Sequence, residues 1–270
     1  MAAEVQPMGP DGLGALDDLD QALDGFLVDL CRRTPGARVQ RQDGLLLAIG
    51  AVPSPVIVNT MLPRDRRVDM EAIDRAMAVY LEVGHRATLF TRDRFDADLE
   101  SDLRAAGWAA ILELPGMVVE APLPDAGPPP GVTLRTVEGD LDRSRWLEAG
   151  LAGFASDEDD RSAMRSAFAT LGSLTGGPIA ASYAEVDGRP VSNAMSWLDA
   201  SVGVGVVGWV GTDPDYRRRG IGAAVTRAVT NAGFALGARL MSLQATPMGR
   251  PVYEKLGYRT VTGYKVWFKP

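Results

Sequence analysis

The sequence predicts a mixed α/β protein built from two domains. Segments of helical periodicity alternate with short apolar, β-branched runs along the 270 residues. This length suits two small domains, and the 46% hydrophobic content can fill their cores. A segment with five prolines and little to bury, 122–131, separates two series of elements. We therefore expect domains at 1–121 and 132–270, joined by this linker.

The first half begins with an amphipathic helix over 16–30, where apolar residues recur every three or four positions. Short apolar runs bounded by glycine and proline predict strands at 45–50 and 55–62. Asp69 is expected to cap a helix that continues to Glu82. The remaining elements are predicted in the same way: a strand at 86–91, a helix at 97–106, and a strand pair at 110–114 and 117–120.

The second half contains a clear hairpin signal, in which an Asp-Gly turn at 187–188 joins strands at 179–186 and 191–198. The other predicted elements are a strand at 132–135, helices at 141–154 and 161–171, a strand at 204–210, a helix from 221, a strand at 239–245, a helix at 251–256, and a strand pair at 258–261 and 264–268.

A segment rich in arginine and glycine, 215–222, joins the strand at 204–210 to a long helical pattern. Gly220 and Gly222 therefore fall at a helix N-terminus, where free backbone N–H groups and the helix dipole favour an anion. Glycine lets the main chain approach phosphate oxygens closely, and the arginines add matching charge. We expect a pyrophosphate to bind at this segment.

Composition excludes several classes of protein. A net charge of −7 and a pI near 4.9 argue against a general nucleic-acid binder. One cysteine, Cys31, cannot form an internal disulfide, and one histidine, His85, argues against a histidine-based metal site; we expect no metal. Residues 1–20 lack the features of a signal peptide, and no apolar run could span a membrane. These features suit the cytoplasm.

A second motif follows the glycine-rich segment. Tyr253 lies in a predicted short helix just before Gly257-Tyr258. Together with Arg217-x-x-Gly220-x-Gly222, this order resembles the Gcn5-related N-acetyltransferase (GNAT) superfamily over 132–270. An asparagine that many members carry shortly before the tyrosine is absent here. The resemblance implies a mixed, mainly antiparallel sheet flanked by helices.

The resemblance also implies acetyl-CoA as the acyl donor. The end of the strand before the motif would pair with the pantetheine amides, and the amides after it would bind the pyrophosphate. The implied coenzyme A-binding residues are Val210, Gly211, Thr212, Arg217, Arg218, Arg219, Gly220, Ile221, Gly222 and Ala223. Tyr253 would protonate the departing thiolate, because a phenol of pKa about 10 is protonated at neutral pH.

The general base and the acceptor stay open. Glu185 is one candidate base, the acidic residues 157–160 are others, and water is a third; charge at a helix start explains 157–160 equally well. We expect acetyl transfer to a primary amine of a small molecule or peptide by direct attack. The alternatives are a non-catalytic acyl-CoA sensor and a structural scaffold. We expect no nucleic-acid or membrane partner, and a homodimer is left open.

The first half repeats the order of the second. Leu103 and Gly107-Trp108 match Tyr253 and Gly257-Tyr258 in position, but the segment 64–70 has no glycines. We therefore expect a degenerate GNAT-like domain over 1–121, without a cofactor motif, and one active site per chain.

Overall fold

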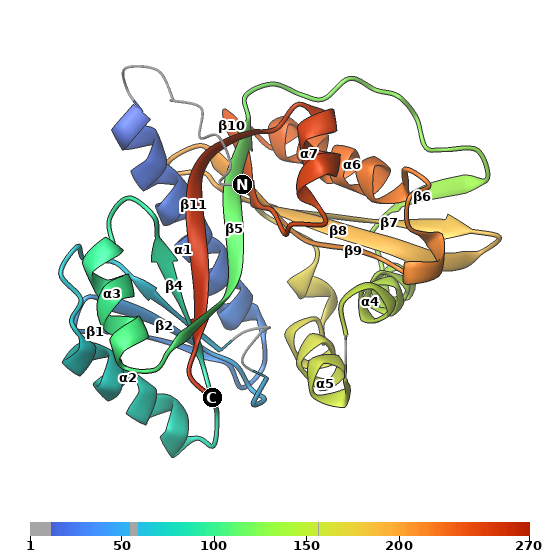
Figure 1. The fold of residues 1–270 in the computed structure, drawn as a ribbon. Coiled ribbons are helices and arrows are strands. Elements are labelled where there is room, and N and C mark those ends of the chain that lie inside the picture. Colours follow the sequence, from blue (N-terminus) through green and yellow to red (C-terminus); the bar gives the residue numbers. More distant parts are fainter. Residues whose placement is uncertain (1–11, 55–58, 156) are drawn as a thin grey trace.

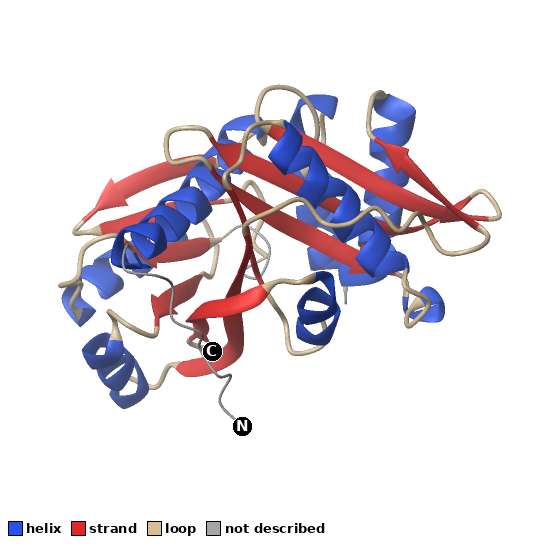
Figure 2. Cartoon of the chain, turned by 90° about the horizontal axis from the view of Figure 1, so that it is seen from above, coloured by secondary structure: helices blue, strands red, loops and turns tan. Residues whose placement is uncertain are grey.

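The computed structural model describes residues 12–54, 59–155 and 157–270, whose strands form one continuous sheet (Figure 1). The strand order is β1-β2-β3-β4-β11-β5-β10-β9-β8-β7-β6. Helices cover both faces (Figure 2). The predicted mixed α/β class is confirmed, but the two halves share a sheet.

The first half follows the predicted order of elements: α1 (Gly12–Arg33), β1 (Arg38–Gln42), β2 (Leu45–Ile49), β3 (Thr60–Pro63), α2 (Met70–Glu82), β4 (Thr88–Arg92), α3 (Ala97–Ala105) and β5 (Ala109–Val119). Strand β1 was not predicted because its sequence, Arg-Val-Gln-Arg-Gln, is polar, as suits an edge strand. Residues 55–58 of the strand expected at 55–62 lie outside the described residues. Asp69 caps α2 as predicted.

The second half comprises β6 (Val132–Thr136), α4 (Asp140–Phe154), α5 (Glu158–Ala167), β7 (Ile179–Val186), β8 (Arg189–Asp199), β9 (Val204–Thr212), α6 (Ile221–Ala235), β10 (Leu240–Gln244), α7 (Arg250–Leu256) and β11 (Arg259–Phe268). Helix α5 begins before the predicted residue 161 because the Asp157 carboxylate caps it, accepting a hydrogen bond from the Asp160 amide at 2.9 Å.

The expected strand pairs at the end of each half are wrong. Each is one long strand: β5 in the first half and β11 in the second. Pro115-Gly116 and Gly263, which lie between the predicted strands of each pair, are part of continuous β-pairing between β5 and β11, and β11 contains register shifts. The glycine at 116 is needed for close approach, since a Cβ there would lie 2.5 Å from the Thr262 Cγ2 atom.

These two strands are exchanged between the halves. Strand β5 pairs with β10, which belongs to the second half, and β11 pairs with β4, which belongs to the first. The two exchanged strands also pair with each other along most of their length. Neither half therefore completes its sheet from its own residues.

Helix α1 joins the halves on one face of the sheet. It contacts β1 and β2 as well as β8 and β9, and it shares a core with α4 and α5. Helices α2 and α3 pack on the opposite face of the first half, and α6 and α7 pack on that of the second. The second half thus has α1, α4 and α5 on one face of β9 and α6 on the other.

Substitution of Trp267 tests whether β11 contributes to the core of the first half. This residue lies on β11 but is fully buried in the core of the first half, where its indole N–H donates to Thr91 Oγ1 at 2.8 Å. We expect Trp267→Ala to lower the free energy of unfolding by ~3–5 kcal/mol, measured by chemical denaturation. The control is Phe268→Ala, at a half-buried neighbour, which should cost clearly less. Equal losses would contradict the assignment of Trp267 to that core.

Candidate functional site

Strands β9 and β10 separate at their carboxyl ends. They pair in parallel only from Val204 to Val206 on β9, opposite Leu240 to Ser242 on β10. Residues 207–212 of β9 then have no partner strand on that side among the described residues. The backbone of Val210, Gly211 and Thr212 is therefore available to a ligand that adds itself as a strand.

The segment after β9 turns sharply into α6. A short 3₁₀ helix, Pro214–Tyr216, is capped by the Asp213 carboxylate, and Gly220 then caps α6 with a φ of 78°. Within the described part of the chain, the backbone N–H groups of 218–223 donate no hydrogen bond; the first one that does is Ala224, to the Gly220 carbonyl. These free donors at a helix N-terminus lie at the segment where the sequence predicts an anion site.

Gly222 and Arg218 contribute to this segment in two further ways. A Cβ on Gly222 would lie 3.1 Å from Thr212 Oγ1, so glycine allows α6 to begin close to the end of β9. Arg218 is exposed and, among the described residues, makes no hydrogen bond or ion pair. Its guanidinium is free to reach a phosphate.

The other two arginines of the segment shape the loop. Arg217 donates through Nε to the Thr212 carbonyl at 3.0 Å and through a terminal nitrogen to the Gly153 carbonyl at 3.3 Å. Arg219 donates to the Asp215 carbonyl at 2.9 Å and lies over the Tyr216 ring. Both side chains are therefore occupied within the protein, and Arg217 ties the loop to the end of α4.

A β-bulge lies on β9 before its end. Asn193 and Met195 of β8 pair with Gly211 and Gly208, so two residues of β9 stand opposite one residue of β8. Trp209, one of the two, has a φ of 53°, which is rare for a large side chain. Its ring makes edge contacts with Phe154 and Phe168, at centroid distances of 5.9 and 4.9 Å.

Tyr253 lies on α7, directly after β10. Its side chain is 8% exposed and packs in the core that β9, β10 and α6 share. Burial raises the pKa of the Tyr253 hydroxyl to about 12. Among the described residues this hydroxyl has no hydrogen-bond partner, although the ring contacts Tyr258 edge-on. It therefore holds a proton at neutral pH that no other protein group accepts.

The candidate bases do not lie with Tyr253. Glu185 is on β7, two strands from β9, where Arg145 donates to it at 2.6 Å and Arg135 lies 3.7 Å away. Residues 157–160 form the start of α5, as the simpler interpretation of that cluster predicted. The structure thus places Tyr253 in the same core as Val210 and Ile221 of the predicted coenzyme A-binding segment, but leaves Glu185 apart.

The equivalent place in the first half is filled. Strands β3 and β4 also pair in parallel and then separate, with α2 as their connection. The Asp69 carboxylate occupies the N-terminus of α2, accepting from the Ala72 amide at 2.8 Å. An anion would have to compete with that carboxylate.

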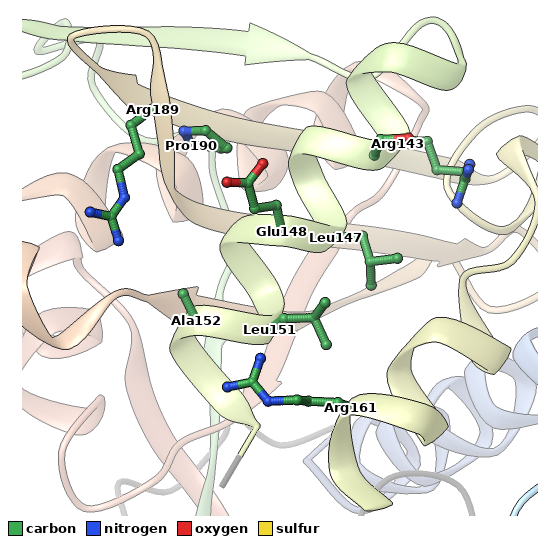
Figure 3. A pocket seen from close by; sticks show the side chains of 9 residues that line it. Arg143, Leu147, Glu148, Leu151, Ala152, Arg161, Arg189 and Pro190 are labelled. Atoms are coloured by element: carbon green, nitrogen blue, oxygen red, sulfur yellow. The ribbon is translucent and has the colours of Figure 1, made fainter. Parts of the chain in front are cut away.

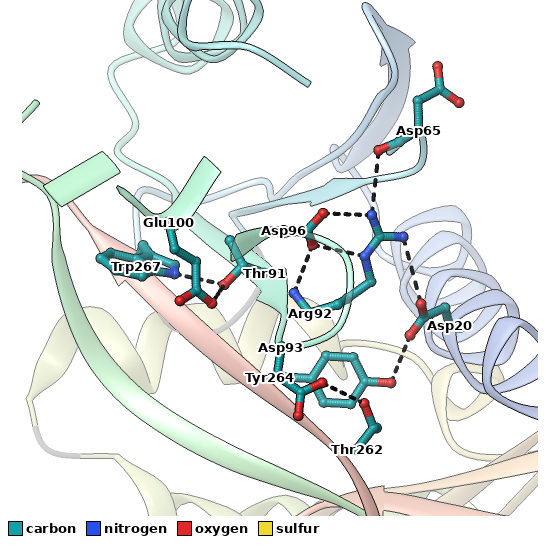
Figure 4. A network of polar contacts seen from close by, with 10 residues as sticks. All are labelled: Asp20, Asp65, Thr91, Arg92, Asp93, Asp96, Glu100, Thr262, Tyr264 and Trp267. Atoms are coloured by element: carbon teal, nitrogen blue, oxygen red, sulfur yellow. Dashed lines mark hydrogen bonds and ion pairs between the residues drawn. The ribbon is translucent and has the colours of Figure 1, made fainter. Parts of the chain in front are cut away.

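Ion pairs occupy the gap between β3 and β4 (Figure 4). Arg92 donates to Asp96 at 2.9 Å and lies 3.7 Å from Asp20, which in turn accepts from the Tyr264 hydroxyl at 2.8 Å. At the edge of this group of ion pairs, Asp24 pairs with Arg64. The remaining cavity is only about 20 Å³, too small for a nucleotide. The first half therefore lacks the open site of the second.

A larger hollow of about 410 Å³ lies over the outer face of α4 (Figure 3). Leu147, Glu148 and Leu151 of α4 line it, together with Arg161 of α5 and Arg189 of β8. None of the residues predicted from the sequence to bind coenzyme A or to act in catalysis lines this hollow.

No group of three or more histidine, cysteine, aspartate or glutamate side chains within the described ranges could hold a metal ion. No described helix is long and apolar enough to cross a membrane.

The sequence of the second half matches a known family model. Residues 179–260 match the family model described as an acetyltransferase (GNAT) domain, and this range includes β9, the glycine-rich turn, α6 and Tyr253. This range lies within the second half of the chain. No curated protein matches the chain.

Solved structures share the fold over nearly the whole chain. A GCN5-related N-acetyltransferase from Kribbella flavida aligns with a TM-score of 0.72 and 20% identity, covering 94% of this chain and 95% of that one. A tandem GNAT protein from the clavulanic acid biosynthesis pathway aligns with a TM-score of 0.55 and 13% identity, covering 93% and 94%. A GCN5-related N-acetyltransferase from Sphaerobacter thermophilus gives 0.58 and 16%, covering 85% and 81%. These structures therefore share the fold of both halves of this chain.

The sequence alone did not identify the functional candidates on the face of the second half that α4 covers. The sequence predicts Trp209 only as part of the strand at 204–210, and it predicts no role for Phe154 or Asn193. The signals were present: a tryptophan between glycines at 208 and 211, and an asparagine within the otherwise buried strand at 191–198.

Gly220 tests the anion site. Its φ of 78° is unfavourable for any β-branched residue, so we expect Gly220→Val to displace the free amides and to weaken coenzyme A binding at least ~10-fold by calorimetry. Gly237→Val is the matched control, because Gly237 also has a positive φ, 106°, but lies at the other end of α6. Unchanged binding in Gly220→Val would contradict the site.

Proposed function

We propose that this chain is an acetyl-CoA-dependent N-acetyltransferase, which transfers an acetyl group to a primary amine of a small molecule or peptide by direct attack. The observation that carries the proposal is the free helix N-terminus at 218–223 beside a separated strand end, with the unpartnered hydroxyl of Tyr253 in the adjoining core. We propose one such site in the described part of the chain.

The second half fits coenzyme A at both ends of the ligand. The unpaired edge of β9 at 210–212 offers main-chain groups to the pantetheine amides, and the six free amides at 218–223 offer donors to the pyrophosphate. Arg218 adds a free positive charge at the turn. Acetyl-CoA supplies an acetyl group already activated as a thioester.

Tyr253 supplies a proton to the sulfur. A hydroxyl that makes no other hydrogen bond can turn toward the thiolate as it forms, and a pKa raised to about 12 by burial keeps it protonated until that moment. Glu185 is held by arginines away from this place, so the proposal leaves removal of the amine proton to water.

The activity is tested with purified protein, acetyl-CoA and a panel of primary amines that includes alkyl amines, amino acid amides and short peptides. Release of free thiol is followed with a thiol reagent. We expect at least one amine to stimulate release above the rate of hydrolysis. Binding of coenzyme A without release for any amine would favour the sensor alternative, and no thermal shift with coenzyme A would favour the scaffold.

Tyr253→Phe should lower kcat by ~10²–10⁴-fold, because the general acid is lost. The affinity for acetyl-CoA should not change, since the ring and its packing remain. Tyr258→Phe is the control: its hydroxyl is already bonded to Thr230 Oγ1 at 2.7 Å. A loss of activity in Tyr258→Phe equal to that in Tyr253→Phe would remove the specific role of Tyr253.

The dependence of kcat on pH follows from the raised pKa of Tyr253. The general acid works only when protonated, so its contribution is complete at low pH and is lost as the pH rises through about 12. We expect no alkaline decrease near pH 10, where an ordinary tyrosine ionises. A decrease centred near pH 10 in the wild type that is absent from Tyr253→Phe would contradict the buried environment.

A further inference from the structure

Asn193 on β8 is buried without hydrogen bonds. The residue is 0% exposed, and among the described residues neither Oδ1 nor Nδ2 has a partner. Leaving a buried polar group unpaired costs free energy, so such a group calls for a functional explanation. Its neighbour Ser192, in contrast, donates to the Gly211 carbonyl at 2.6 Å.

The amide lies between α4 and the end of β9. Asn193 pairs in register with Gly211, next to the bulge at Trp209. A Cβ on Gly211 would lie 2.8 Å from Oδ1, and a Cβ on Gly150 of α4 would lie 2.9 Å from Nδ2. Two glycines thus make room for this one side chain, on the face of the sheet opposite α6.

The cover over Asn193 is an intrinsically weak piece of helix. The end of α4 contains Gly150 and Gly153, each of which lowers helix stability by ~1 kcal/mol relative to alanine. Gly153 allows the helix to touch the backbone of β9, since a Cβ there would lie 2.8 Å from the Thr212 amide nitrogen. Phe154, 40% exposed, follows directly. A small outward movement of this turn would open the space beside Asn193 to the end of β9.

The other fully buried asparagine with described contacts behaves differently. Asn59 accepts from the Gly50 amide at 2.8 Å and donates to the carbonyls of Val52 and Ser54 at 2.8 and 2.7 Å. Its amide is saturated by protein groups, as a structural asparagine should be. The unpaired amide of Asn193 is therefore not a general property of buried asparagines in this chain.

We propose that Asn193 is a specificity residue for the acceptor, and that it binds the acceptor's amine and a neighbouring carbonyl when the end of α4 moves away from β9. The inference rests on the proposed acetyltransferase function. An amide offers one acceptor and two donors side by side, so it matches an acceptor group that presents an N–H next to a C=O. Trp209, on β9 two residues before Gly211, provides an apolar, aromatic surface for the acceptor's side chain.

This assignment selects a substrate class. An α-amino amide or peptide N-terminus carries a carbonyl beside its amine, whereas a simple alkyl amine does not. A site with a buried hydrogen-bonding group discriminates against a ligand that leaves the group unpaired. The chain should therefore prefer α-amino carbonyl compounds with an apolar or aromatic side chain.

The test compares two probes that differ in the carbonyl: phenylalaninamide and 2-phenylethylamine. We expect kcat/KM of the wild type to favour phenylalaninamide at least ~10-fold. In Asn193→Leu this ratio should collapse through a higher KM for phenylalaninamide, with the KM for acetyl-CoA unchanged. Equal use of both probes by the wild type, or an unchanged ratio in the variant, would overturn the inference.

Stability separates this role from a structural one. Asn193→Leu and Asn193→Ala break no hydrogen bond, so at least one of them should keep the melting temperature of the wild type in the absence of ligands. Asn59→Leu and Asn59→Ala, which break several, should lower it clearly. If both Asn193 variants lose as much stability as the Asn59 variants, the Asn193 amide is structural and the inference fails.

The two proposals fail in different ways. If other amines in the panel stimulate thiol release but phenylalaninamide does not, acetyl transfer stands and the role of Asn193 falls. If no amine stimulates release, and phenylalaninamide shifts the melting temperature of the wild type and of Asn193→Leu equally in the presence of coenzyme A, both proposals fall.

Discussion

The pairing of β5 with β11 at the centre of the sheet is the constraint on which the rest of the structure depends. Each strand begins in one half and completes the sheet of the other, so the two halves hold one another in a single register. Helix α1 adds a second connection, because it contacts strands of both halves on one face of the sheet. The orientation of β10, and with it the gap beside β9, is therefore set by residues from the first half.

The two halves show how one architecture gains or loses an anion site. Both contain a parallel strand pair that separates, with a helix as the connection. In the second half the helix starts at a glycine and its first amides donate no hydrogen bond among the described residues. In the first, the Asp69 carboxylate accepts from the Ala72 amide, and ion pairs lie at the end of β4.

Much of this could be predicted from local sequence. Asp69 caps its helix, the Asp-Gly hairpin forms, and the turn at Gly220 starts α6, because each depends on residues close together in the chain. The exchange of β5 and β11 could not be predicted, since the sequence of an apolar strand does not specify which neighbouring strand it pairs with. The sequence shows an asparagine within the strand at 191–198, but whether its amide is paired depends on three separate elements and could not be predicted.

The exchanged strand also affects how the chain can fold during synthesis. Roughly 165 residues separate β4 from β11, its neighbour in the sheet. At ~5–20 residues per second, the ribosome needs on the order of 10–30 s to make them. During that time the first half has no partner for the open edge of β4 and no Trp267 in its core. Both halves can therefore reach their final form only after β11 has been made, and a chaperone that shields the edge of β4 would act within this interval.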